Sequence, residues 1–496
     1  MNKLLDGLKE KANLTTTENG ALTHKTSKSY VLDYFAQGSA LRNRDENSII
    51  SLFNDAFQED SLLAMKVLFN SRDVRGGQGE RKTFRTIINN LAINNPEVIE
   101  KNIEFIPFFG RWDDLYALFN TPLEKKAIEL IKKQLDEDIK SDNPSLCAKW
   151  LASENASSKQ TKELATKTRV GLKMTSKQYR KMLSSLRKKI KIVETLITNK
   201  DYSSIEYDKV PSQAGLKYKS CFWENDSERY FKFLESVNKG EKKINVGTLS
   251  PYEIVSKVPK YNYWGGNREL SLEKRKTLNT MWGQLPDYVE DKFENAIAVV
   301  DVSGSMEGTP MDIAISLGLY LAEKSEGEFA NHFITFESNP SLVEIKGKDF
   351  VEKVQNISRA SWGESTNIKK VFNLILKTAI KKQITQAEMP SRIIIISDME
   401  FDDMAQDLYY EYDNYEYATL FETIKQEFKD AGYEMPRLVF WNADSRQNNI
   451  PMTMDENVQL VSGASPRLFT QVLKDYSAYE LMLEVLNDKR YDCVTV

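Results

Sequence analysis

The sequence predicts a multidomain α and α/β protein, with a helical N-terminal half and a C-terminal domain built on a doubly wound sheet. Two patterns predict this fold class. From residue 1 to about 285, amphipathic helical stretches recur between polar turns, and strand signals are almost absent. From about residue 292 onward, short apolar runs alternate with helical patterns, which is typical of a parallel sheet covered by helices. A chain of 496 residues has room for both domains.

The helical half consists of short helices joined by short turns. The apolar spacing predicts helices over residues 47–57, 61–70, 80–94, 96–105, 113–119 and 123–140. Short helices in antiparallel pairs favour an α-solenoid, which can close into a ring. No fixed period is visible, so any repeat is degenerate and HEAT-like. We therefore assign residues 1–285 to a helical-repeat domain.

The C-terminal half alternates strands and helices. Strands are predicted over residues 296–300, 331–336, 342–345, 392–398, 437–442 and 458–463, and helices over residues 311–321, 368–380, 419–431 and 466–474. The run at 342–345 is short and reads as an edge strand. We therefore assign residues 292–496 to one α/β domain.

Polar side chains follow two of the apolar runs. Asp301, Ser303 and Ser305 come directly after the run at 296–300, and Asp398 ends the run that begins at Arg392. In open α/β sheets, ligands bind at the carboxyl ends of the strands. Carboxylate and hydroxyl oxygens suit a hard cation such as Mg²⁺. Because Asp/Ser/Gly loops are also ordinary turns, the first loop alone is weak evidence for a metal site.

The order of these groups strengthens the metal interpretation. The D-x-S-x-S loop, a loop threonine and a strand-end aspartate together resemble the metal-ion-dependent adhesion site of a von Willebrand factor A domain. The resemblance implies that Mg²⁺ or another divalent cation is held by Asp301, Ser303, Ser305, Thr366 and Asp398. It also implies that one metal position stays open for an acidic group of a protein partner. The alternative is a domain that kept the loop geometry but no longer binds metal.

The net charge of −4 hides an uneven distribution. Residues 149–275 carry 27 Lys and Arg against 14 Asp and Glu, whereas residues 287–496 carry 20 against 36. Such asymmetry suggests a basic binding region beside an acidic domain. A solvated surface is the other interpretation of the acidic half.

The strongest basic stretch runs over residues 159–191, with twelve Lys and Arg against one acid. Ser176 is a plausible N-cap of a helix that buries an apolar stripe and exposes its cations. A cationic helix face is typical of binding to a phosphate backbone. The candidate RNA-binding residues here are Lys173, Lys177, Arg180, Lys181, Arg187, Lys188 and Lys191. Downstream, Tyr218, Phe222 and Trp223 lie among further lysines and could stack on bases.

A second candidate is the glycine-rich loop at residues 72–82. Its backbone amides, with the cations Arg75, Arg81 and Lys82, could hold a phosphate. The alternative is a turn with glycine caps. The loop lacks the G-x-x-x-x-G-K-[ST] pattern, so nucleotide hydrolysis is not indicated.

A helical repeat followed by an A domain resembles the TROVE-plus-A-domain architecture of the Ro ribonucleoproteins. It resembles more closely an uncharacterised Ro-like family defined only as a domain of unknown function. That second resemblance is carried by R-G-G-Q-G-E-R at 75–81, G-R-W-D-D-L at 110–115, K-W-L at 149–151 and Y-R-K-M-L-S-S-L-R at 179–187. The resemblance to the Ro proteins implies RNA binding, in RNA quality control or as a ribonucleoprotein scaffold. We hypothesise that the protein does this without catalysis.

Two other function classes remain open. In the first, the chain is a protein-interaction scaffold whose bound metal captures a partner's carboxylate. In the second, carboxylates after Asp398, namely Glu400, Asp402 and Asp403, build a nuclease-like site. The second is disfavoured because the two histidines and three cysteines form no catalytic triad, zinc spacing or disulfide framework. The absence of a bilayer-length apolar run or secretory segment predicts a cytoplasmic protein without a membrane partner.

Overall fold

The computed structural model describes residues 8, 12–190, 192–260, 270–289, 295–336, 340–358, 367–402, 419–454 and 457–496. The chain forms two compact units. The sheet unit comprises residues 1–67 and 249–488, and the helical unit comprises residues 68–248 and 489–496. Helices together with a mixed sheet that has a parallel core confirm the predicted α and α/β class. None of the described helices combines the length and apolar character needed to cross a bilayer.

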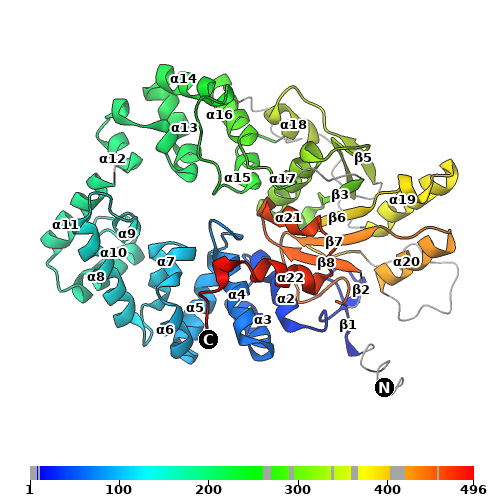
Figure 1. Ribbon diagram of the computed structural model, residues 1–496, viewed down its shortest axis with the longest axis horizontal. Helices are drawn as coiled ribbons and strands as arrows, with labels where there is room; N and C mark the ends of the chain where they lie inside the picture. The colour runs from blue at the N-terminus through cyan, green and yellow to red at the C-terminus, as the bar shows by residue number, and fades with distance from the viewer. Residues whose placement is uncertain are drawn as a thin grey trace. The chain divides into compact units, whose positions relative to one another are not determined.

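The sheet unit is built on a six-stranded sheet in the order β5-β4-β3-β6-β7-β8 (Figure 1). The strands are β3 Ala296–Asp301, β4 His332–Phe336, β5 Ser341–Glu344, β6 Arg392–Ser397, β7 Arg437–Asn442 and β8 Val458–Ser462. Only the edge strand β5 runs antiparallel to its neighbour. The residues of β3, β6 and β8 are buried throughout, which explains why β3 and β6 contain continuous apolar runs rather than alternating ones.

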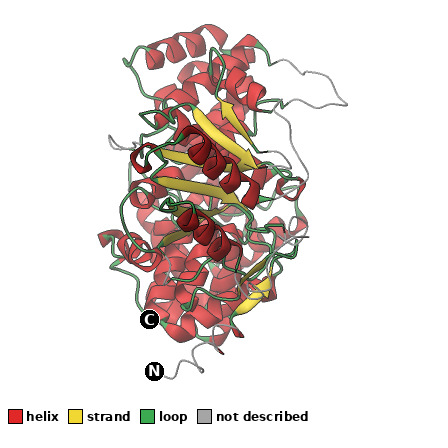
Figure 2. Ribbon diagram, turned by 90° about the vertical axis from the view of Figure 1, so that its right-hand side faces the viewer, coloured by secondary structure: helices red, strands yellow, loops and turns green. Residues whose placement is uncertain are grey.

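Helices cover the sheet on both faces. They are α17 Thr309–Lys324, α18 Phe350–Ile357, α19 Ile368–Lys382, α20 Leu420–Asp430, α21 Phe469–Val472 and α22 Ala478–Leu486. Helix α17 packs on β3, β4 and β6, and α22 packs on β8. Figure 2 shows the strands in yellow with helices lying in front of them. At one close approach, a Cβ on Gly318 of α17 would lie 2.4 Å from the Val300 side chain, so glycine lets this helix meet β3.

The sheet unit also contains residues from the N-terminal half. These form β1 Leu14–Thr16, β2 Leu22–His24, α2 Tyr30–Gln37, α3 Glu46–Glu59 and the start of α4 Ser61–Arg72, followed after the helical unit by α15 Pro251–Val255 and α16 Leu272–Gly283. Helix α2 packs on β7 and β8, and α15 packs on α17. The compact units therefore differ from the predicted domains 1–285 and 292–496. Long-range burial of α2 against the sheet decides where residues 1–67 belong.

The helical unit contains α5 Lys82–Asn94, α6 Pro96–Asn102, α7 Phe105–Phe109, the 3₁₀ helix η2 Trp112–Leu118, α8 Glu124–Lys140, α9 Cys147–Trp150, α10 Lys159–Gly171, α11 Ser176–Lys189, α12 Val193–Thr198, α13 Ser212–Asn225 and α14 Ser227–Asn238. Most contacts join helices that are close in the sequence, such as α5 with α6, α8 with α9 and α13 with α14.

The last eight residues fold onto the helical unit. Tyr491 stacks on Phe109 with ring centroids 5.5 Å apart, and its hydroxyl bonds to Asn70. Arg490 pairs with Asp73, whose side chain is fully buried. The Thr495 amide donates to Asn102 at 3.1 Å. These contacts were not predicted, because they join segments about four hundred residues apart in the sequence.

Buried Asp33 gives the sheet unit a pH dependence. Its carboxylate accepts the Ser27 amide at 2.7 Å and the Thr26 hydroxyl, yet burial raises its pKa to about 6. The native state therefore binds a proton more tightly than the unfolded chain, so this group's contribution to stability falls as the pH rises from about 4 to 6. The fall is on the order of 3 kcal/mol. Urea unfolding against pH should show that Asp33→Asn removes this slope, whereas Asp55→Asn, at an exposed position of α3, leaves it unchanged.

Candidate metal centre and nucleic-acid interface

The candidate metal residues lie at the point in the sheet where the strand order changes side. From β3 the chain continues to β4 on one side, and β6 lies on the other side. The carboxyl ends of β3 and β6 are therefore the topological switch point, where open α/β sheets bind their ligands. Asp301 is the last residue of β3, and Asp398 directly follows β6. The fold thus brings together two residues that lie 97 positions apart in the sequence.

Asp301 is fully buried and held on both oxygens. Its Oδ1 accepts the Ser303 amide at 2.9 Å, and its Oδ2 accepts the Ser397 hydroxyl at 2.6 Å. Burial, and then the charge of Asp398, raise the pKa of Asp301 to about 7. Two buried carboxylates close enough to perturb each other are unfavourable without a positive charge between them.

The other described members of the site are oxygen-bearing side chains. Ser303 and Ser305 lie on the loop after β3, and their hydroxyl oxygens are 3.1 Å apart. Asp398 Oδ1 accepts the Glu400 amide, but its Oδ2 is buried without a hydrogen bond in the described structure. Arg446 forms an ion pair with that oxygen, with its Nη1 at 3.6 Å. A carboxylate oxygen that accepts no hydrogen bond and two hydroxyl oxygens are ligands that suit a divalent cation.

Thr366, the fifth candidate, lies outside the described residues. Helix α19 begins two positions later, with Asn367 as its N-cap. Among the described residues, no group of three or more His, Cys, Asp or Glu side chains is arranged for a metal. A site of two carboxylates completed by hydroxyls and water does not need such a group.

The carboxylates after Asp398 have structural partners. Glu400 is buried, and it accepts the Glu18 amide at 2.5 Å and the Asn449 amide group at 3.0 Å. Burial raises the pKa of Glu400. Glu400 holds the β1–β2 hairpin and also lies close enough to Asp398 to feel its charge, and Asp403 lies outside the described residues. Sequence reasoning missed two site residues, Ser397 and Arg446. The serine at the end of β6 was a readable signal, whereas nothing local marks Arg446.

Three of the candidate lysines lie on one narrow stripe of helix α11. At 100° per residue, Lys177, Lys181 and Lys188 fall within about 40° of one another, and all are exposed. The buried residues Tyr179 and Leu186 point to the opposite side of the helix. In the described part of the chain, no acidic side chain pairs with any of the three lysines. The helix is capped by Thr175, with Gln178 completing a capping box, rather than by Ser176 as predicted.

Arg187 is placed differently from the prediction. Its guanidinium is half-buried and donates to the carbonyls of Ala148 and Leu151 and to the hydroxyl of Ser153, each at 2.8 Å. At about 280° on the helical wheel it lies on the flank of α11, where it holds the segment after α9. Its role in the structure is to satisfy buried backbone carbonyls, and it is not part of the exposed lysine stripe.

The remaining cations of residues 159–191 differ in their exposure and in their partners. Lys173 is exposed just before α11, with a positive φ of 56°. Arg180 is exposed and lies 4.0 Å from Glu154. Lys189 donates to the carbonyls of Ile139 and Ser141, which end α8. Lys191 lies outside the described residues.

The glycine-rich loop is tightly packed. A Cβ on Gly77 would lie 1.9 Å from the Asn70 carbonyl oxygen, so the loop needs glycine for its own backbone packing. The amides of Arg81 and Lys82, at the start of α5, both donate to the Glu80 carboxylate at 3.0 Å. The chain thus supplies its own anion where a phosphate was expected. Arg75, Arg81 and Lys82 remain exposed.

The aromatic residues near the basic stretch are mainly core. Phe222 is 1% exposed, and it packs with Tyr207 and Tyr230 between α13 and α14. Trp223 is half-buried against Tyr230, at a centroid distance of 5.4 Å. Tyr218 is half-buried, with the Lys217 ammonium 4.9 Å from its ring centroid. Phe222 therefore cannot stack on a base without unfolding its surroundings, and the prediction for it is wrong.

Comparisons with known proteins place the chain in a family. Residues 17–143 and 142–293 match the profile of the domain of unknown function DUF2828, and residues 295–492 match that of DUF7788. The uncharacterised protein L728 of Acanthamoeba polyphaga mimivirus is 32% identical over 520 residues, covering 96% of this chain and 87% of the viral protein. The predicted Ro-like membership is wrong, because DUF2828 is a different family and no TROVE or von Willebrand factor A profile supports it. The chain belongs to the DUF2828 family.

Proposed function

We propose that the chain binds RNA without catalysing a reaction, and that α11 of the helical unit holds the RNA backbone. The observation that carries this proposal is the stripe formed by Lys177, Lys181 and Lys188. Three exposed ammonium groups on one helix face, none of them in an ion pair with a described acidic side chain, leave their charge available to phosphates. The stripe extends over about 16 Å of helix, enough to meet several successive phosphates of one strand.

The position of the stripe favours binding over simple solvation. Lysines that only keep a helix soluble are usually interspersed with acids at i+3 and i+4. On α11, the positions between the lysines are serines, Ser184 and Ser185, which can donate to phosphate oxygens. Lys173 and the cations Arg75, Arg81 and Lys82 are further exposed candidates in the same unit. Backbone contacts of this kind give affinity without sequence preference.

The lysine stripe can be tested by charge reversal. The triple variant Lys177→Glu, Lys181→Glu, Lys188→Glu should weaken binding of a single-stranded RNA of about 20 nucleotides by at least about a hundredfold at low salt. The slope of log affinity against log salt should fall by about two to three, because each lost phosphate contact removes about one unit. Fluorescence anisotropy across a salt series measures both quantities.

The matched control reverses Lys377, Lys381 and Lys382, which are exposed at the end of α19 in the sheet unit. The control should leave both affinity and salt slope unchanged. If the two triple variants lost affinity equally, binding would reflect overall charge, and the α11 proposal would fail. Retention of binding in a variant with only Arg187→Met would support the structural role of that side chain.

We propose as a second candidate that the sheet unit binds a divalent cation at the switch point, in the arrangement of a von Willebrand factor A domain. The buried Oδ2 of Asp398, which accepts no hydrogen bond in the described structure and lies near the Asp301 carboxylate, supports this. Asp301, Ser303, Ser305, Asp398 and, from sequence, Thr366 would hold the cation. A bound cation would offer a Lewis-acidic position to a carboxylate, so a protein-interaction scaffold is the alternative function.

The HEAT-like character of the helical unit is proposed from its contacts between neighbouring helices.

A further inference from the structure

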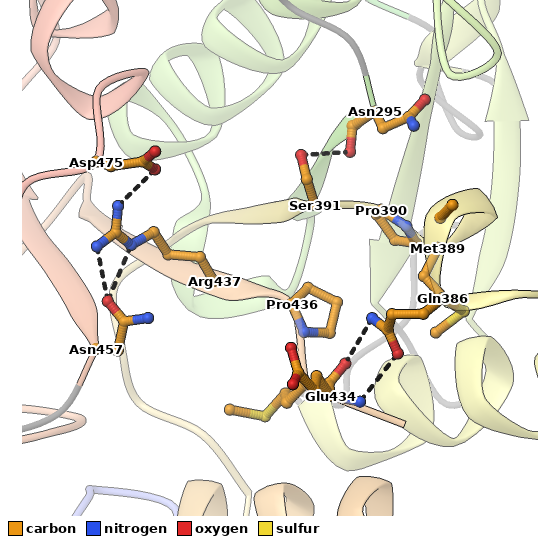
Figure 3. Close-up of a pocket in the computed structure, with 12 residues that line it drawn as sticks. Asn295, Gln386, Met389, Pro390, Ser391, Glu434, Pro436, Arg437, Asn457 and Asp475 are labelled. Carbon is orange, nitrogen blue, oxygen red and sulfur yellow. Dashed lines mark hydrogen bonds and ion pairs between the residues drawn. The ribbon is translucent and has the colours of Figure 1, made fainter. Parts of the chain in front are cut away.

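A pocket of about 480 Å³ lies in the sheet unit at the amino ends of β6 and β7, the edge opposite to the switch point (Figure 3). Its lining includes Ser391, directly before β6, and Arg437, the first residue of β7. Asn295, Asn457 and Asp475 come from segments that flank the sheet. The volume is that of a small-molecule site.

The charged end of the pocket is Arg437, which lies beside the more buried Arg392 of the neighbouring strand. Arg392 and Arg437 are register partners at the first positions of β6 and β7. Both donate to one oxygen of Asp475, at 3.0 Å from Arg392 Nη2 and 2.8 Å from Arg437 Nη1. Arg437 also directs Nε and Nη2 to the amide oxygen of Asn457. Two guanidinium groups thus share a single carboxylate.

The two arginines are far more buried than the carboxylate that they share. Their side chains are 9% and 14% exposed, whereas the Asp475 side chain is 92% exposed. Arg392 Nε is buried without a hydrogen bond in the described structure. Burial, and then the charge of Arg437, lower the pKa of Arg392. The arginines therefore remain in place if the exposed Asp475 side chain turns away.

The rest of the pocket is rigid and partly apolar. The side-chain amide of Gln386 exchanges two hydrogen bonds with the backbone of Glu434, which ties two loops together (Figure 3). Met389, Pro390, Met435 and Pro436 add apolar surface. The Glu434 carboxylate is the other acidic group of the lining, and it is exposed. An occupant would therefore meet a cationic end and an apolar wall.

We infer that this pocket binds a small organic oxyanion, a phosphomonoester or a carboxylate, whose charged group replaces Asp475 on Arg392 and Arg437 and whose body lies on the wall formed by Pro390 and Pro436. Asp475 then acts as an internal competitor that occupies the arginines when the ligand is absent. Bidentate pairing of arginine with phosphate or carboxylate oxygens supplies the recognition. This site is independent of the proposed RNA and cation sites.

The test uses the full chain and isothermal titration calorimetry with four probes: inorganic phosphate, acetate, phenyl phosphate and benzoate. Asp475→Asn should bind the preferred oxyanion at least about tenfold more tightly than the wild type, because the competing carboxylate is gone. Asp142→Asn, at an exposed position of the helical unit, is the matched control and should bind like the wild type. Comparing the affinity for phosphate with that for acetate identifies which charged group the ligand carries. Each phenyl-bearing probe should bind more tightly than its parent anion.

The gain in oxyanion affinity should disappear when Asp475→Asn is combined with either Arg437→Met or Arg437→Lys. The lysine variant keeps the charge but not the fork, and thermal unfolding verifies that both variants are folded. The inference is overturned if Asp475→Asn shows no gain over the wild type, or if the gain survives Arg437→Met. It is also overturned if the phenyl group adds nothing to affinity, because the pocket beyond the arginines would then have no occupant.

Discussion

We expect Mg²⁺ to stabilise the wild-type protein against unfolding, and replacing Asp301 by asparagine should abolish this gain while making the cation-free protein more stable. At a cation concentration of 100 times Kd, binding adds about 2.7 kcal/mol to the free energy of unfolding. In EDTA at pH 8, wild-type Asp301 carries a buried charge beside Asp398, and its raised pKa corresponds to a cost of at most about 4 kcal/mol. Asparagine removes that charge and can still accept the Ser303 amide.

The measurement is urea unfolding at pH 8 in saturating MgCl₂ and in EDTA. Asp398→Asn should behave in the same way, because it removes the other carboxylate of the pair. Glu307→Gln is the matched control, an exposed acid two residues after Ser305. It should keep the full Mg²⁺ gain. If wild type and Asp301→Asn gained equally from Mg²⁺, the cation would bind elsewhere, and the switch-point proposal would be refuted without affecting the α11 proposal.

The elements of the sheet were predictable because their residues are buried on both faces. The predicted run at 437–442 coincides with β7, and the run at 296–300 misses only Asp301 of β3. Parallel strands between two helical layers are mostly apolar, and in β3 and β6 the first polar residue after the apolar run marks the end of the strand. That polar residue is also where a ligand site is expected. One physical cause therefore made both the strand ends and the candidate site readable from sequence.

Features that depend on distant partners were not predictable. The β1–β2 hairpin has only three residues in each strand, and it is held by contacts with Glu400 and Ile450. Arg187 and Lys188 are adjacent in the sequence and equally basic, yet only Arg187 turns to the backbone carbonyls near α9. Charge and helical spacing predict which side of a helix is cationic, with an error of about one residue at its edge. They do not tell which flanking cation meets an unsatisfied carbonyl from another segment.

The second large effect concerns Asp114, in the G-R-W-D-D-L motif. Its fully buried carboxylate accepts Arg72 Nε at 2.8 Å, Arg85 Nε at 2.6 Å and the Arg111 amide at 2.8 Å. A Cβ on Gly110 would lie 2.2 Å from this carboxylate, so the glycine permits its approach. Asp114→Ala leaves the buried Arg72 guanidinium without its partner. The expected loss is about 3–5 kcal/mol of unfolding free energy in the helical unit.

Two further variants separate a lost ion pair from lost packing. Asp113→Ala removes a neighbouring carboxylate whose partners Arg85 and Arg111 are about a quarter exposed, so it should cost only about 1 kcal/mol. Arg72→Met combined with Asp114→Leu replaces both buried charges by apolar groups and should recover most of the loss. Urea unfolding, with hydrogen exchange of the η2 amides reporting on the helical unit, measures each variant. A double variant as unstable as Asp114→Ala would show that the hydrogen bonds from Arg85 and the Arg111 amide, rather than the unpaired charge of Arg72, dominate the cost.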